Sequence, residues 1–257
     1  MKRPNGEQAS DKPADGGRAL PRRFYQSATI APVAGGAGEA QGYRLLLDGK
    51  TLRTPAKADF VVPTRDLAEA VAAEWQAQEE RIDPANMPLT RLVNSAIDGV
   101  AGRRAEVAAE IVNYGLSDLV CYRAADPLEL VRRQAEAWDP ILDWCREALG
   151  MGLERAIGIV PVAQPEAAGA VLAAWLETLN AFELAAVHTM TTLMGSAVLA
   201  LAHARDRLPC ATAWAAAHID EDFQAEKWGV DSIAQARREQ RWRQMQAASL
   251  LLRLGRP

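Results

Sequence analysis

The hydrophobic pattern of the chain changes its period at residue 64, and this change limits the possible folds more than any other feature. Residues 23–63 form short runs in which apolar and polar positions alternate, as in FYQSATIAPV, and this is typical of half-buried strands. From residue 64 onward, apolar residues recur every three to four positions almost to the end of the chain, which is typical of helices. The pattern predicts an α+β protein with a small N-terminal antiparallel β domain followed by a larger all-helical domain.

Two short motifs support this division. Asp48 and Gly49 separate two apolar runs in GYRLLLDGKTLRTP, and they favour a primed hairpin turn because both residue types tolerate positive φ. Thr64 directly precedes the first helical stripe, so we expect it to cap that helix. The GKT triplet that begins at Gly49 resembles the end of a phosphate-binding loop. Arg44 stands where that loop needs a glycine, so we expect no nucleotide site there.

The chain is predicted to have three parts. Residues 1–21 are rich in proline, glycine and charged residues and lack an apolar stripe, so we expect a disordered arm. Residues 22–85 are expected to form the β-rich N-terminal domain together with the first helix. Residues 86–257 are expected to form the helical C-terminal domain, because the helical period continues through them.

Composition excludes several classes of protein. The net charge of −4 argues against a nucleic-acid partner, and no apolar run reaches the ~18 residues that a membrane helix needs. The three cysteines, Cys121, Cys145 and Cys210, are far apart, which predicts reduced thiols rather than a disulfide framework. The first residues, MKRPNGEQASDKPAD, match neither a secretory signal nor an acid-poor targeting segment. We therefore expect a cytoplasmic bacterial protein.

The segment HIDEDFQAEKWG, residues 218–229, concentrates charge next to aromatic residues. Its histidine and four carboxylates are His218, Asp220, Glu221, Asp222 and Glu226. The helical period continues from Pro209 to Gly229, so we expect one helix with Phe223 on its core-facing stripe and the acids near its C-terminal end. Acids at that end oppose the helix dipole by about 0.3–1 kcal/mol each.

Two explanations for these acids remain open. Basic residues of the last helix could pair with them across the turn that follows Gly229; these are Arg237, Arg238, Arg241 and Arg243. Alternatively, the acids could contact another protein. The sequence alone does not separate an internally paired charged face from a binding face.

A metal site is the other chemistry that this segment suggests. His218 and Glu221 are three residues apart, as are His203 and Asp206, and such pairs can ligate a metal from one helix face. A di-iron helical bundle needs two Glu-x-x-His helices, and this motif does not occur in the sequence. We expect no metal and no cofactor; a metal-dependent helical enzyme using His218 and Glu221 is the alternative.

Several blocks of the sequence together resemble a known family. In chain order they are RFY with GYRLLLDGKTLRTP, LAEAVAAEWQAQ with IDPANMPLTRLVNSAID, SDLVCYRA, QAEAWDPILDWC, MGSAVLALA and AWAAAHIDEDFQAEKWG. They are similar to blocks of the ATP synthase assembly chaperones of mitochondria and alpha-proteobacteria, which handle the alpha subunit of the soluble catalytic head. The resemblance covers residues 22–254, nearly the whole chain.

The resemblance implies a chaperone rather than an enzyme. Such a protein binds the unassembled alpha subunit, covers the surface destined for its neighbour, and leaves when the head assembles. By this resemblance, Glu221, Asp222 and Glu226 are candidates for charged contact with the client, and Phe223 and Trp228 shape that helix end. We expect a monomer that forms a 1:1 complex without a cofactor.

Overall fold

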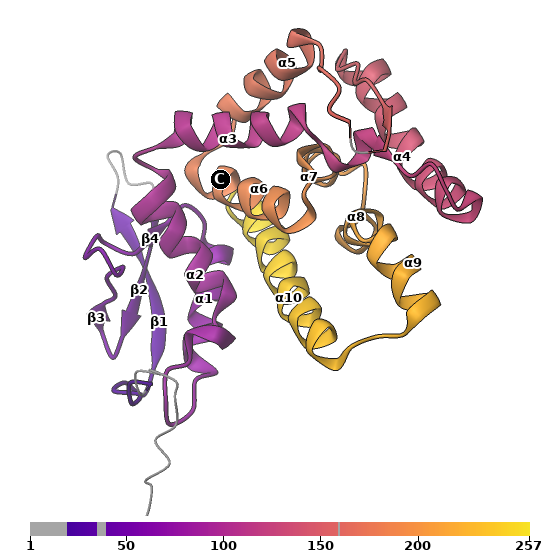
Figure 1. The fold of residues 1–257 in the computed structure, drawn as a ribbon. Helices are drawn as coiled ribbons and strands as arrows, with labels where there is room; N and C mark the ends of the chain where they lie inside the picture. The colour runs from indigo at the N-terminus through magenta and orange to yellow at the C-terminus, as the bar shows by residue number, and fades with distance from the viewer. Residues whose placement is uncertain (1–19, 35–39, 159) are drawn as a thin grey trace, which may run out of the picture.

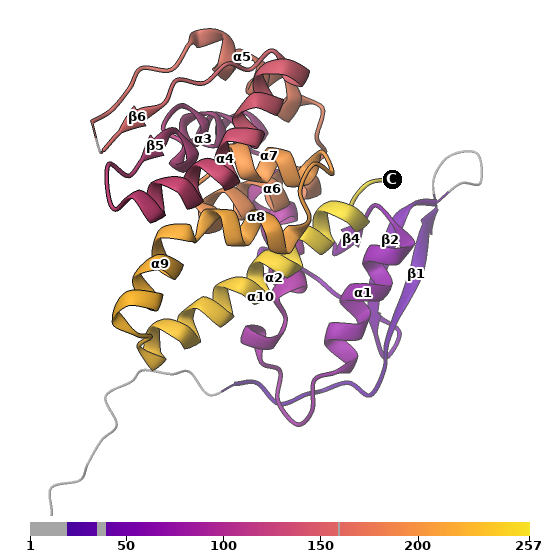
Figure 2. The ribbon, with the colours of Figure 1, turned by 90° about the vertical axis from the view of Figure 1, so that its right-hand side faces the viewer.

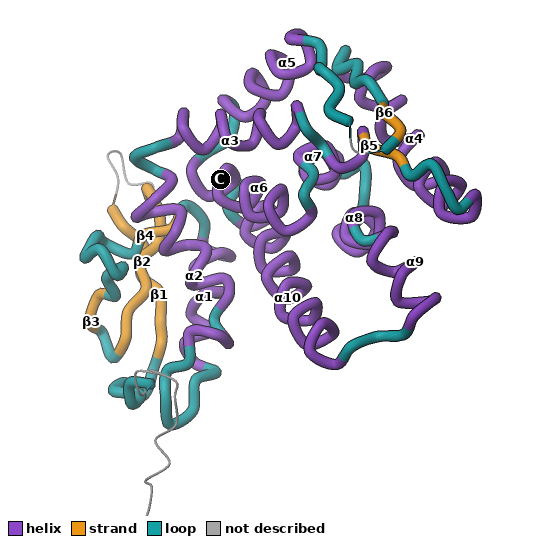
Figure 3. Tube along the Cα trace, in the orientation of Figure 1, coloured by secondary structure: helices purple, strands orange, loops and turns teal. Residues whose placement is uncertain are grey.

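Figure 1 shows the fold of the chain in a computed structural model, which describes residues 20–34, 40–158 and 160–257. The predicted disordered arm lies outside the described residues as far as residue 19. In the described part, a small antiparallel sheet comes first and a set of helices follows, so the predicted α+β class is confirmed. Figure 3 shows strands β1 to β4 gathered at one side of the molecule, with helices forming most of the rest.

The N-terminal sheet is built around its longest strand. Its four strands are β1 (Ala28–Ala34), β2 (Ala40–Leu47), β3 (Lys50–Thr51) and β4 (Val61–Val62). β2 pairs with β1 along one edge. On its other edge, β3 pairs with the C-terminal end of β2 and β4 pairs with its middle. The predicted hairpin turn is confirmed: Asp48 and Gly49 join β2 to β3 with φ values of 46° and 78°.

Helices make up most of the chain after the sheet. In the described residues they are α1 (Arg65–Gln76), α2 (Pro88–Ser95), α3 (Arg104–Leu116), α4 (Leu128–Leu149), α5 (Glu166–Glu177), α6 (Ala181–Met194), α7 (Ala197–Ala204), α8 (Cys210–Ala217), α9 (Ile219–Trp228) and α10 (Ser232–Leu254). Short turns of 3-10 helix (Pro84–Asn86, Leu119–Cys121) and π-helix (Ala96–Val100) connect some of them. Strands β5 (Tyr122–Arg123) and β6 (Ala156–Ile157) form a small parallel pair.

Local capping explains where several helices begin. Thr64 caps α1 as predicted, because its hydroxyl accepts a hydrogen bond from the Leu67 amide at 3.2 Å. Asp231 caps α10 by accepting from two backbone amides of the first turn. Asn180 and Glu183 form a reciprocal capping box at the start of α6.

One apolar cluster joins the sheet to the helices. It includes Leu45 of β2, Leu67 of α1, Val93 of α2, Met190 of α6 and Leu251 of α10, all nearly inaccessible to solvent. In Figures 1 and 2, α1 lies between the sheet and α10, and α10 extends past α2 and α6. One face of the second half of α10 is thereby buried, while its first half extends away from the cluster toward α9.

No helix in the described part of the chain combines the length and apolar character that a membrane crossing requires.

Candidate partner-binding site

The prediction of one helix over residues 209–229 is wrong, because the chain breaks at His218 into α8 and α9. The His218 backbone leaves helical geometry, with φ −116° and ψ 20°. Its ring stacks on Trp214 with centroids 3.9 Å apart, and Nδ1–H donates to the Trp214 carbonyl at 2.7 Å. His218 is therefore a buried terminating residue of α8 rather than a side chain on a solvated face.

This break reverses the expected relation between the acids and the helix dipole. Asp220, Glu221 and Asp222 lie in the first turn of α9 instead of near the C-terminal end of a longer helix. Carboxylates are stabilising at a helix N-terminus, where backbone N–H groups are unpaired. Lys227 lies in the last turn, where a cation is also favourable. The charge pattern of α9 thus stabilises the helix.

Two of the acids pair with the last helix, as one of the two open explanations requires. Asp222 forms a hydrogen-bonded ion pair with Arg238, and this bond raises the pKa of the Arg238 guanidinium. Glu221 lies 3.9 Å from Arg241, near the limit of an ion pair. These two pairs connect α9 to α10.

Glu226 pairs with a different helix from the one expected. Its carboxylate lies 2.8 Å from Arg133 of α4, and Arg133 also lies 2.7 Å from Glu129. Lys227 completes the group at 3.2 Å from Glu129. The hydrogen bond from Arg133 lowers the pKa of Glu226. The pKa of Glu129 is also lowered, most by the hydrogen bond from Lys227 and next by the hydrogen bond from Arg133. We call Glu129, Arg133, Glu226 and Lys227 the α4–α9 ion cluster.

Phe223 is covered by this cluster. The side chain is buried, with the Arg133 guanidinium 5.4 Å and the Lys227 ammonium 5.2 Å from its ring centroid. Both distances suit cation–π attraction. Asp220 adds a further contact with α4 by accepting a 2.6 Å hydrogen bond from the amide of buried Gln134. Phe223 therefore anchors α9 to α4, in agreement with its predicted core-facing position.

The structure offers little support for the metal hypothesis. His218 Nε2 lies 4.0 Å from the nearer Glu221 oxygen, and burial lowers the pKa of the imidazole. Over the described ranges, no three histidine, cysteine or acidic side chains lie close enough together to hold a metal ion. His203 uses its two ring nitrogens on the Leu208 carbonyl and the Ser249 hydroxyl.

Beyond the acids, α9 ends in an exposed apolar surface. Trp228 is 79% exposed, and Val230 and Ile233 follow it at 63% and 60%. We call Trp228, Val230 and Ile233 the apolar tip.

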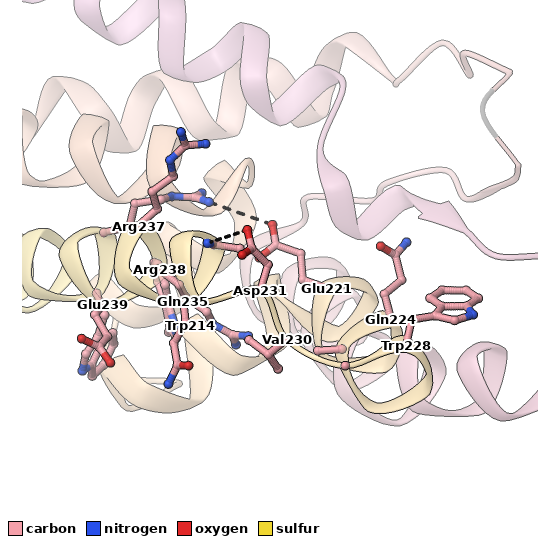
Figure 4. A pocket seen from close by; sticks show the side chains of 15 residues that line it. Trp214, Glu221, Gln224, Trp228, Val230, Asp231, Gln235, Arg237, Arg238 and Glu239 are labelled. Atoms are coloured by element: carbon pink, nitrogen blue, oxygen red, sulfur yellow. Dashed lines mark hydrogen bonds and ion pairs between the residues drawn. The ribbon is translucent and has the colours of Figure 1, made fainter.

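A groove of about 850 Å³ lies between α9 and α10 (Figure 4). Its more buried lining side chains are Trp214 and Trp242, whose ring centroids are 5.5 Å apart. Glu221 points into the groove toward α10. Trp228 and Glu239 lie at the two ends of the groove in Figure 4. The groove and the apolar tip therefore share Trp228 and Val230.

The contributions of α4 and of the two tryptophans do not follow from the sequence pattern. Arg133 and Glu226 are 93 positions apart, and no local pattern connects them. Trp214 and His218 are four residues apart, a spacing that places side chains together on a helix. That spacing was a usable signal that His218 packs against an aromatic ring rather than facing solvent.

Comparison with known proteins adds to this geometry. The family model for the ATP12 chaperone protein matches residues 22–146. A curated relative, the mitochondrial protein atp12 of Schizosaccharomyces pombe, is 25% identical over 220 residues, covering 81% of this chain and 74% of the relative.

Two solved structures are similar over nearly the whole chain. Atp12 from Paracoccus denitrificans has a TM-score of 0.84 and 44% identity, covering 92% of this chain and 99% of its own. A protein of Agrobacterium tumefaciens described as a putative chaperone has a TM-score of 0.86 and 47% identity, covering 91% and 86%. These likenesses define an α+β protein of the chaperone class. The chain belongs to the ATP12 chaperone family.

Proposed function

We propose that this chain is an assembly chaperone for ATP synthase that binds the unassembled alpha subunit of the catalytic head. It covers the subunit interface of that client until the head assembles, acts without catalysis or a cofactor, and works as a monomer in a 1:1 complex. Membership of the ATP12 chaperone family supports a chaperone role. The bacterial relatives of known structure favour a bacterial cytoplasm as the place of action.

The observation that carries this proposal is the apolar tip beside the acids of α9. An unassembled subunit exposes apolar surface that would otherwise aggregate, and a holder needs apolar surface to cover it. Trp228 presents a large aromatic side chain to solvent at the end of a helix. Tryptophan is enriched among the residues that dominate binding energy at interfaces.

The acids supply charge next to this apolar surface. The side chains of Glu221, Asp222 and Glu226 remain 57%, 40% and 52% exposed although each has an internal basic partner. A carboxylate accepts several hydrogen bonds, so each can meet a cation of the client without losing its own arginine. In this proposal Phe223 sets the position of α9, and Trp228 contacts the client.

Exchanging the charges of Asp222 and Arg238 tests whether Asp222 contacts the client or only holds α9 to α10. Asp222→Arg combined with Arg238→Asp keeps an ion pair between α9 and α10 but moves the carboxylate to α10. If Asp222 contacts the client, the double variant binds purified alpha subunit about tenfold more weakly than the unmodified chain. Binding equal to that of the unmodified chain would show that this acid only holds α9 in place.

The wider proposal is tested with the purified alpha subunit and the full chain. Size-exclusion chromatography with light scattering should give a 1:1 complex with alpha subunit and none with beta subunit. Trp228→Ala should weaken that complex about tenfold, since an exposed aromatic anchor would be lost. Phe24→Ala removes a ring of similar exposure from the N-terminal part of the chain and serves as the control. The absence of any complex with alpha subunit would reject the proposal.

A further inference from the structure

We propose that the groove between α9 and α10 receives two or three large apolar side chains from one amphipathic helix of the client. Arg237, on the α10 wall, binds a carboxylate that flanks this apolar stripe. The inference rests on the proposed function and adds to it the place where the client docks and the chemistry of the docked segment.

The shape of the groove favours a helix with protruding side chains. The α9 wall is one helical face, since Glu221, Gln224, Ala225 and Trp228 follow the i, i+3, i+4, i+7 spacing. Ala225 on this wall and Ala234 on α10 are small and leave space above Trp214 and Trp242. A volume of about 850 Å³ lies within the range of small-molecule pockets, which suits a few side chains and excludes a whole helix.

The first turns of α10 bury no side chain within the described chain. Residues 231–237 are all exposed, including the apolar Ile233 and Ala234. Most helices in proteins are stabilised by packing an apolar face, and residues 231–237 bury none. A client helix lying over the groove would cover Ala234 and the neighbouring apolar tip, which together form one continuous surface through Trp228 and Val230.

The arginines of α10 that have no internal partner within the described chain indicate which charge the client helix should carry beside its apolar side chains. Arg238 and Arg241 already face Asp222 and Glu221 of α9. Arg237, within the described ranges, has no acidic group within 4.0 Å.

The one acidic side chain nearby on α10 does not offset Arg237. Glu239 and Arg237 project from opposite sides of α10 in Figure 4. Glu239 is also four residues before Arg243, a spacing at which the two charges attract along one helix face. Asp231 and Glu239 also line the groove, but Glu239 projects from the other side of α10. The side of the groove that carries Arg237 is therefore positive, and it complements a carboxylate.

Two matched substitutions test occupation of the groove. Ala234→Trp fills the groove, whereas Ala236→Trp places the same side chain on the same exposed helical half outside it. With purified alpha subunit and the full chain, we expect Ala234→Trp to raise the Kd about tenfold or more and Ala236→Trp to change it less than about twofold. Equal effects of the two substitutions would overturn the groove as the docking site.

A second pair tests the charge of the client helix. Arg237→Glu should raise the Kd about fivefold, with the difference shrinking at high salt, whereas Arg243→Glu outside the groove should leave it nearly unchanged. An unchanged Kd for Arg237→Glu would overturn the carboxylate assignment.

The failures of the two proposals are distinguishable. If the unmodified chain does not bind alpha subunit at all, the proposed function fails and the docking site with it. If the unmodified chain binds but Ala234→Trp binds equally well, only the docking site fails. If sedimentation shows a dimer of the chain alone that Ala234→Trp dissociates, the groove joins two copies and the client assignment is overturned.

Discussion

Asp118 is a buried carboxylate that lies away from the candidate site. It accepts hydrogen bonds from backbone amides at the starts of two helices. Its side chain accepts from the Val120 amide at 3.2 Å and from the Val198 amide at 2.9 Å. It thereby caps the 3-10 helix Leu119–Cys121 and also binds the first turn of α7. Complete burial raises the pKa of Asp118 to about 6, although the Ser196 hydroxyl and the backbone amides act in the opposite direction.

This raised pKa predicts a specific pH dependence of stability. Because the folded value lies above the ordinary 3.8, the native state holds the proton more tightly than the unfolded state. The contribution of Asp118 to the free energy of unfolding is therefore largest below pH 4 and is lost as the pH rises through about 6. A shift of this size corresponds to about 3 kcal/mol.

Comparison with Asp118→Asn isolates this effect, since the variant cannot ionise. We compare urea unfolding at pH 4 and at pH 7.5. Relative to the unmodified chain, the free energy of unfolding of the variant should rise by about 2 kcal/mol at the higher pH. Asp206→Asn, at an exposed position, should show no such change. The same pH dependence in the unmodified chain and in Asp118→Asn would contradict the assignment.

At the scale of elements, α1 supplies the cap that α2 lacks. Met87 precedes α2 and offers no side-chain cap. Glu74 of α1 takes this role: its carboxylate accepts from the amides of Leu89 at 2.8 Å and Thr90 at 2.7 Å, and from the Thr90 hydroxyl at 2.7 Å. Burial raises the pKa of Glu74, and these hydrogen bonds counteract the rise.

Glu74→Ala should therefore destabilise the fold by about 2 kcal/mol, because it leaves the donors at a partly buried helix start without an acceptor. The measurement is the urea-unfolding midpoint followed by circular dichroism. Glu69→Ala is the control on the same helix; it removes only an exposed i, i+4 pair with Arg65 and should leave the midpoint unchanged. Equal losses for both substitutions would show that Glu74 is not a cap.

These contacts show which parts of the fold the sequence could predict. Thr64 and the Asp48–Gly49 turn act on neighbours within a few positions, so their roles follow from local rules. The pairing of Glu226 with Arg133 depends on how α4 meets α9, and local periodicity carries no such information. The break at His218 escaped prediction because the apolar period continues across it, while the ring stacking that ends α8 is a feature of packing.

The attachment of α9 depends strongly on charge. All ten residues of α9 are described, and Phe223 is the only one of them that is buried. The helix is held to α4 by the α4–α9 ion cluster and to α10 by the pairs of Asp222 and Glu221. Exposed ion pairs are screened by salt, whereas apolar burial is not weakened in this way.

Raising NaCl from about 0.05 M to about 0.5 M should therefore speed amide exchange in α9 severalfold more than in α8. Helix α8 is the internal control because it buries Ala213, Trp214 and Ala216. Hydrogen–deuterium exchange read by mass spectrometry measures both helices in one experiment. Arg133→Met should speed exchange of α9 already at low salt. Equal salt responses of α8 and α9 would mean that apolar contacts hold α9.

At the scale of the whole molecule, the sheet and the helices share one apolar cluster. The predicted boundary between residues 85 and 86 falls in the 3-10 helix Pro84–Asn86, yet the cluster includes Leu45 on one side and Met190 on the other. The Thr64 hydroxyl also donates to the Leu254 carbonyl, which ties the start of α1 to the end of α10. A shared core predicts that both parts unfold in one cooperative transition.

Leu45→Ala tests this cooperativity, because Leu45 is a sheet residue with 1% exposure. Removing its side chain should cost about 2–5 kcal/mol through lost burial and the cavity left behind. In one cooperative unit, that loss lowers the urea midpoint of the helical signal at 222 nm, although the substitution lies in the sheet. Lys50→Ala, at an exposed position of the same sheet, should leave the midpoint unchanged. If Leu45→Ala left the urea midpoint of the 222 nm signal unchanged, residues 86–257 would fold independently of the sheet.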